Sequence, residues 1–95
     1  MEQGKHSELL ERTNQVGVDF LLADLNMAST FLRVAETSNS AESRVRNFHL
    51  ALEGYRTVIH FLPRVLPSSE ELAEIHTKLN GLKLQLQQAG YLSKT

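Results

Sequence analysis

The chain contains no cysteine and only two prolines, and its 95 residues carry a formal net charge of −1. Without cysteine there is no disulfide framework, no thiolate metal site and no cysteine nucleophile. A charge so close to zero gives no global attraction to nucleic acid or anionic lipid. The apolar runs are too short for a membrane span or a signal-peptide core. We therefore expect a cytoplasmic protein that binds neither nucleic acid nor membrane and carries no cofactor.

The length and the hydrophobic content predict one compact domain. Chains of 95 residues do not divide into two cores. The hydrophobic fraction is 41%, which is near the globular average and too high for a disordered chain. The five glycines are scattered, and none forms a phosphate-binding loop after a strand. Nucleotide binding by that route is excluded.

The clearest helix lies between the polar cluster at residues 37–40 and Pro63. Ser40 is expected to cap its N-terminus, and Pro63 is expected to end it. Its apolar residues are spaced alternately three and four positions apart, which places them on one face of a helix. This stripe consists of Val45, Phe48, Leu52, Tyr55, Ile59 and Leu62. The pattern predicts a helix over residues 41–62.

A second helix is predicted over residues 69–89. Ser68 and Glu71 have the spacing of a capping box, and Gly90 follows where a left-handed C-cap residue is expected. Gly81 lies inside this helix and is expected to sit against the helix at 41–62, because interior glycines are tolerated at close contacts. The apolar stripe is Leu72, Ile75, Leu79, Leu82, Leu86 and Ala89.

The first segment carries a stripe that consists of Leu21, Leu25, Ala28, Leu32 and Ala35. An unbroken helix from residue 7 to residue 38 would be about 48 Å long, against about 33 Å for the helix at 41–62. Two alternatives follow. Either the helix breaks near Gly17 and Asp19 caps the next one, which we favour, or residues 7–18 protrude. In the second case Leu9, Leu10 and Val16 are buried against something else.

Short connections between these segments favour an all-α antiparallel up-down-up three-helix bundle. We place the bundle at residues 18–90, after an N-terminal extension at 1–17 that is partly flexible or forms a short extra helix. Residues 91–95 form a C-terminal tail. The helix at 41–62 is expected to be central, because Leu50, Gly54 and Phe61 give it a second apolar flank.

Part of the central helix resembles the second helix of a tetratricopeptide repeat. Ala51, Tyr55, Val58 and Pro63 have the spacing of the small, aromatic, small and helix-ending residues of that motif. The layout of residues 20–89 also resembles the MIT domain, a three-helix relative of such repeats. Both resemblances imply a module that binds a helix or extended peptide in a groove between helices and has no catalytic activity.

The side of the central helix that faces away from its apolar stripe is mostly basic. It is a candidate surface for an acidic peptide or phosphate, or a solvated face on which Glu53 pairs with Arg56 or His49. The candidate partner-binding residues on and beside this face are Arg46, His49, Leu50, Arg56, His60, Phe61 and Arg64.

The sequence contains two further spacings that occur in metal sites or catalytic sites. His49 and Glu53 stand four residues apart, as helix-borne ligands can, but His60 and His76 do not complete a recognisable set, so we predict no metal. Arg44 and His49 have the Arg-x4-His spacing of HEPN ribonucleases, in which both residues would act on a phosphate.

Three further large side chains on the first segment are ambiguous. Phe20, Met27 and Phe31 resemble anchors for a partner helix, yet such residues at helical spacing usually belong to the core, and we assign them there.

The sequence thus predicts a small helical protein–protein interaction or assembly module that is not an enzyme. The alternatives are a HEPN-type ribonuclease that uses Arg44 and His49, and a structural homodimer that uses residues 7–18 and the outer face of the first helix.

Overall fold

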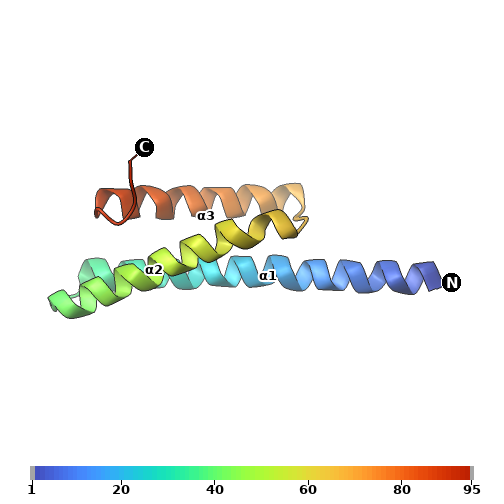
Figure 1. Ribbon diagram of the computed structural model, residues 1–95, viewed down its shortest axis with the longest axis horizontal. Coiled ribbons are helices and arrows are strands. Elements are labelled where there is room, and N and C mark those ends of the chain that lie inside the picture. Colours follow the sequence, from blue (N-terminus) through green and yellow to red (C-terminus); the bar gives the residue numbers. More distant parts are fainter. Residues whose placement is uncertain (1, 95) are drawn as a thin grey trace.

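The computed structural model describes the backbone of residues 2–94 and the side chains of residues 8–94. Met1 and Thr95, the outermost residues of the expected extension and tail, lie outside the described residues. The chain forms α1 (Glu2–Thr37), α2 (Ala41–Phe61), a 3-10 turn η1 (Leu62–Arg64) and α3 (Ser69–Gln88). Successive helices run antiparallel (Figure 1), so the expected all-α three-helix bundle is confirmed.

α1 is continuous from Glu2 to Thr37, and the break favoured near Gly17 is wrong. A Cβ atom at Gly17 would lie 2.7 Å from Cγ1 of Val65, in the connection between α2 and α3. Glycine at this position therefore marks a close approach of two segments and not a helix end. The expected boundary at residue 17 falls inside this helix.

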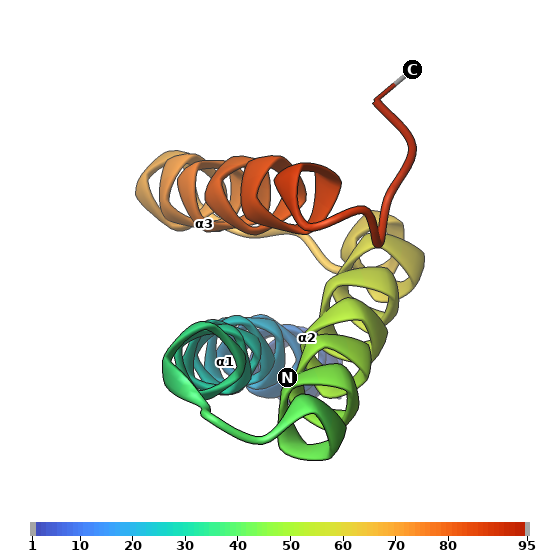
Figure 2. The same cartoon turned by 90° about the vertical axis from the view of Figure 1, so that its left-hand side faces the viewer.

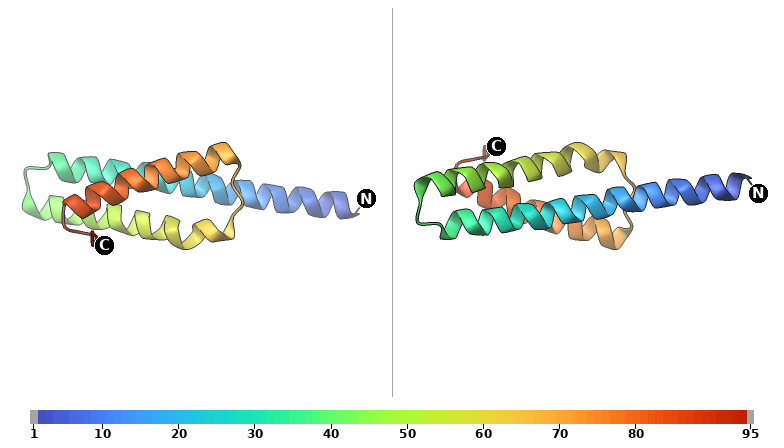
Figure 3. Two further views of the ribbon diagram at one scale, coloured as in Figure 1. Left: turned by 90° about the horizontal axis from the view of Figure 1, so that it is seen from above. Right: turned by 90° about the horizontal axis from the view of Figure 1, so that it is seen from below.

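The N-terminal part of α1 projects beyond the rest of the bundle (Figure 3). α1 has 36 residues, whereas α2 has 21 and α3 has 20. At about 1.5 Å per residue, α1 is roughly 20 Å longer than either partner. We call residues 2–13 the overhang. The alternative in which residues 7–18 protrude is correct for residues 7–13, where Leu9 and Leu10 are exposed, but not for the residues after them: Asn14 bonds to Leu66, and Val18 is fully buried.

The overhang begins where the connection between α2 and α3 is fastened to α1. The side chain of Asn14 donates to the carbonyl oxygen of Leu66 (2.9 Å) and accepts from its N–H (2.6 Å). The next residue, Gln15, donates to Glu71 in the first turn of α3 (3.0 Å). These bonds join residues more than fifty positions apart and fix the point at which α1 leaves the bundle.

The predicted caps are present. The Ser40 side chain accepts from the N–H of Ser43, and Ser68 and Glu71 form the capping box of α3. After α3, Gly90 has a φ of 87° and its N–H donates to Gln87, while the N–H of Tyr91 donates to Leu86. This is a Schellman motif.

The Schellman motif turns the chain back onto the bundle. The ring of Tyr91 stacks on Phe48 of α2, with centroids 4.7 Å apart and planes 19° apart. Leu92 also packs against the core. The sequence boundary at residue 90 placed both residues in a tail, but the turn at Gly90 directs them to apolar surface that α2 leaves open.

The three helices surround one shared core. The sequence predicted that α2 would lie between the other two helices, but α1 and α3 also contact each other. α3 lies against both α1 and α2, and α1 makes the more extensive contact with α2 (Figure 2). The expected α1 stripe is buried in full, as are Ile75, Leu79, Leu82 and Leu86 of α3. Leu72 and Ala89, at the two ends of the α3 stripe, are exposed.

α2 approaches α1 through small residues. A Cβ atom at Gly54 would lie 2.9 Å from Cβ of Ala28, so the two helices are close at this point. The buried face of α2 includes the residues on either side of this contact. Ala51 and Val58 are fully buried, whereas Val45 and Ile59, predicted for the stripe, are nearly half exposed.

The prediction that Gly81 contacts α2 is wrong. A Cβ atom at this position would meet no atom within 4 Å, because Gly81 lies on the solvent side of α3.

The two interior glycines give a matched pair of alanine substitutions. We expect Gly81→Ala to stabilise the protein by about 0.5–1 kcal/mol, because alanine favours the helix and meets no neighbour. Gly54→Ala is expected to destabilise it by about 1 kcal/mol or more, because the overlap with Ala28 outweighs the helix propensity. Urea denaturation measures both. Stabilisation by Gly54→Ala would contradict the close contact of α1 with α2.

The bond between Gln15 and Glu71 predicts a dependence of stability on pH. The pKa of Glu71 is lowered, first because Gln15 donates to its carboxylate and then because the N–H of Ser68 does. A lowered pKa stabilises the folded state above the ordinary value, and this contribution is lost as the pH falls through the lowered pKa.

We expect Gln15→Ala to raise the pKa of Glu71 toward its ordinary value in an NMR titration of the carboxyl carbon. The variant should also lose less stability than the parent between about pH 7 and about pH 3. Gln85→Ala, at another exposed glutamine, is the control and should leave both measurements unchanged. An unchanged Glu71 titration in Gln15→Ala would show that the bond is absent in solution.

Candidate functional site

α1 carries a second apolar stripe that no part of the described bundle covers. Its members alternate by four and three positions along 26 residues, and every one is exposed. We call this surface the α1 strip; it consists of Leu9, Thr13, Val16, Phe20, Ala23, Met27, Thr30 and Val34. It contains no charged residue. A stripe with this spacing is the surface that packs against another helix in coiled coils.

The α1 strip lies at the middle of the solvent-facing side of α1. At 100° per residue it is roughly 140° from the buried stripe that faces the core. α2 and α3 pack on the two other sides of α1 (Figure 2). Phe20 is 53% exposed and Met27 55% exposed, so their assignment to the core is wrong. Phe31 does pack against the core, as predicted.

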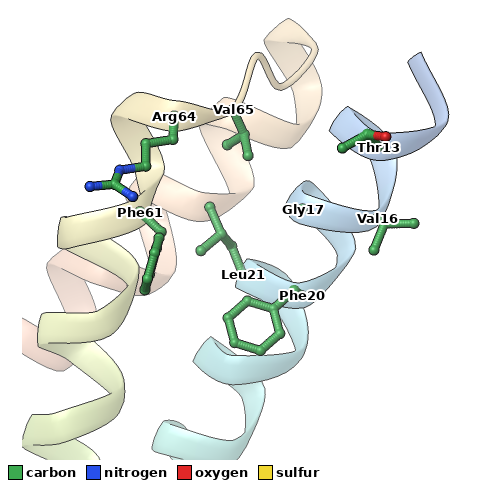
Figure 4. A pocket seen from close by; sticks show the side chains of 8 residues that line it. All are labelled: Thr13, Val16, Gly17, Phe20, Leu21, Phe61, Arg64 and Val65. Carbon is green, nitrogen blue, oxygen red and sulfur yellow. The ribbon is translucent and has the colours of Figure 1, made fainter. Parts of the chain in front are cut away.

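A pocket of about 390 Å³ opens beside the N-terminal half of the α1 strip (Figure 4). Figure 4 shows Phe61 and Val65 on the side of α2 and η1, Phe20 on the side of α1, and Leu21 between them. Its remaining lining residues are Thr13, Val16, Gly17 and Arg64. The walls are almost entirely apolar, and no acid–base pair lines them. Such a pocket suits an apolar side chain of another molecule rather than a polar substrate.

A second, shallower pocket of about 280 Å³ lies farther along the same helix. Asn26, Met27, Thr30 and Phe31 line it, and two of these residues belong to the α1 strip. The α1 strip therefore has two pockets along it, one beside Val16 and Phe20 and one beside Met27 and Thr30.

The candidate residues on the outer side of α2 differ in exposure and in neighbours. Arg46 and Arg56 are exposed, and Leu50 is half-buried. The His49 ring stands edge-on to Tyr91, with centroids 5.4 Å apart. Among the side chains that the structure describes, Glu53 pairs with neither Arg56 nor His49; the recorded ion pair joins Glu74 and Lys78.

Two of the predicted residues do belong to the large pocket. Phe61 is 39% exposed and lines it, and the Arg64 guanidinium lies 5.4 Å from the centre of the Phe61 ring at the rim. His60, the neighbour of Phe61, stands edge-on to that ring on the outer side, with centroids 4.8 Å apart. The structure thus joins the end of the basic face of α2 to an apolar surface of α1.

The two residues of the Arg-x4-His pair have different neighbours. Arg44 donates to the carbonyl oxygen of Ser38 (3.0 Å) and holds the turn between α1 and α2. His49 lies five residues along α2, about 140° around the helix, beside Tyr91. Among the described residues no three histidine, aspartate or glutamate side chains gather at metal-binding distance, and His76 lies on α3, apart from His49 and His60.

The sequence contains a signal for the α1 strip. Leu9, Val16, Phe20, Met27 and Val34 follow heptad spacing, in parallel with the stripe that forms the core. Two apolar stripes on one helix can both be buried if other helices of the same chain pack on both sides of it. The spacing of the residues does not show on how many sides this helix is covered.

Among the residues that the structure describes, no helix combines the length and the apolar character needed to cross a membrane. Comparisons with protein family models, with curated proteins and with solved structures find no match to this chain, so the resemblance to tetratricopeptide repeats and the MIT domain stays a prediction.

Proposed function

We propose that this protein is a small helical interaction or assembly module that binds another protein helix on the α1 strip and has no catalytic activity. The observation that carries the proposal is the strip itself: eight uncharged residues in heptad spacing, all exposed, on the longest helix. A cytoplasmic location, expected from the absence of cysteine, is part of the proposal.

The exposed side chains support binding rather than packing within the chain. Leu9 is 61% exposed and Val16 is 69% exposed, and these residues flank the point where α1 leaves the bundle. Contiguous apolar patches of this extent on a small protein mark interaction sites. The pocket at Phe20 and Phe61 offers a place for a large side chain of the partner, which is how anchoring residues gain most of their binding energy.

The proposal moves the binding surface from α2 to α1. The basic residues Arg46, Arg56 and His60 stay candidates for secondary contacts, because they are exposed on the outer side of α2, whose C-terminal residue Phe61 lines the pocket. Arg64 at the pocket rim suits a partner residue that is acidic or a main-chain carbonyl oxygen.

A photoreactive benzoyl-phenylalanine tests which face binds. Placed at Val16, it is expected to give a covalent protein adduct on illumination of extract from the source cells. Placed at Arg56 on α2, it is expected to give little. The adduct at Val16 should disappear when Phe20→Ser is added, because this change removes the apolar wall of the pocket without touching the core.

Mass spectrometry of the adduct identifies what is bound. Adducts from Arg56 but not from Val16 would assign the function to the basic face of α2. No adduct from either position would contradict the proposal of an interaction module.

A further inference from the structure

We propose that the partner of the α1 strip is a second copy of the same chain, packed antiparallel so that the two α1 helices lie together at the centre of a symmetric dimer. This inference rests on the proposed function and names the partner of the same surface. The two-fold symmetry is the usual one for homodimers, in which one patch contacts itself.

The strip is complementary to itself in one antiparallel register that uses its whole length. Phe20 of one copy then lies opposite Ala23 of the other, and the outermost layer pairs Leu9 with Val34. Between them, Val16 meets Met27 and the threonines of the strip meet each other. Each large side chain faces a smaller or more flexible one, which keeps the spacing of the two helices even.

A parallel dimer in register packs the same strip poorly. It sets Phe20 against Phe20 and Ala23 against Ala23, so the helices would be forced apart at one layer and leave a void at the next. It also brings Asp19 of one helix next to Asp24 of the other, because residues five positions apart flank the seam of a parallel pair. The antiparallel register avoids these contacts.

The exposed area is sufficient for a stable dimer. Six large apolar side chains on the strip and the overhang are about half exposed: Leu9, Leu10, Val16, Phe20, Met27 and Val34. With on the order of 200 Å² for a fully exposed large side chain, they offer about 600 Å² per copy. If all of this area is covered, two copies together bury about 1,200 Å² from these residues, which is the lower end of the range of specific stable interfaces.

The same register covers most of the overhang and fills both pockets. Residues 6–13 of one copy run opposite residues 30–37 of the other copy's α1, so Leu10 reaches the half-buried Phe31. Met27 of one copy points at the large pocket beside Val16 of the other. The pocket beside Val16 of one copy therefore faces the pocket beside Met27 of the other copy. The contact between these two residues closes both pockets.

The mass of the protein in solution tests the dimer. Sedimentation equilibrium at about 100 µM should give twice the chain mass, because an interface of this size supports a dissociation constant in the micromolar range or below. Met27→Glu is expected to raise the dissociation constant at least about tenfold, since each dimer would bury two unpaired carboxylates. Leu84→Glu is the matched control: Met27 and Leu84 are both 55% exposed, but Leu84 lies on α3.

Both variants should keep the helical circular dichroism and the melting temperature of the folded monomer, because neither side chain is in the core. A parent protein that is monomeric at this concentration overturns the proposal. So does an equal effect of the two variants on the dissociation constant.

A spin label tests the orientation, and the chain has no native cysteine to interfere. With a nitroxide on Arg33→Cys, the antiparallel dimer places the two labels about 35 Å apart along the axis, whereas a parallel dimer places them within about 20 Å. Double electron–electron resonance measures this distance. A short distance would overturn the antiparallel register.

The two proposals fail in different ways. If the parent is monomeric but the label at Val16 gives adducts with a different protein, the self-association is wrong and the interaction module stands. If the parent is monomeric and Val16 gives no adduct, both are wrong.

Discussion

The difference in length between α1 and its two partners is the constraint on which the rest of the structure depends. Two helices of about twenty residues cannot cover one of thirty-six. The bundle therefore ends where Asn14 and Gln15 fasten the connection between α2 and α3 to α1. Beyond that point, the side chains of residues 8–13 are all exposed. The 390 Å³ pocket lies where α1 extends past the end of α2. One of its walls is formed by α1 and the other by the end of α2 and η1.

The placement of α2 decides which face of α1 stays open. Gly54 and Ala28 allow the backbones of α1 and α2 to come close, and α3 then closes the core from the remaining side. This arrangement uses the stripe with Leu21 and Leu25 and leaves the stripe with Phe20 and Met27 in solvent. A three-helix bundle can cover only part of the circumference of each helix, so a helix with two apolar stripes retains one for another molecule.

The basic face of α2 illustrates why spacing alone did not locate a site. Arg46, His49 and Arg56 share that face, as the helical period requires, but the described residues of α2 and η1 that line the 390 Å³ pocket are Phe61 and Arg64. This pocket exists because α1 runs past the end of α2. A helical projection shows which residues share a face, and it carries no information on what that face meets. His49 meets Tyr91, which the turn at Gly90 returns to the bundle.

The sequence by itself determined the fold class, the extents of α2 and α3, and the caps at Ser40, Ser68 and Gly90. These features depend on neighbours within a few residues, whose chemistry is written in the chain. The tertiary structure alone decided that α1 continues through Gly17, that Gly54 rather than Gly81 is a close contact, and that the α1 strip is exposed. Each of these depends on which segments far apart in the chain come to lie side by side, and local pattern does not specify that.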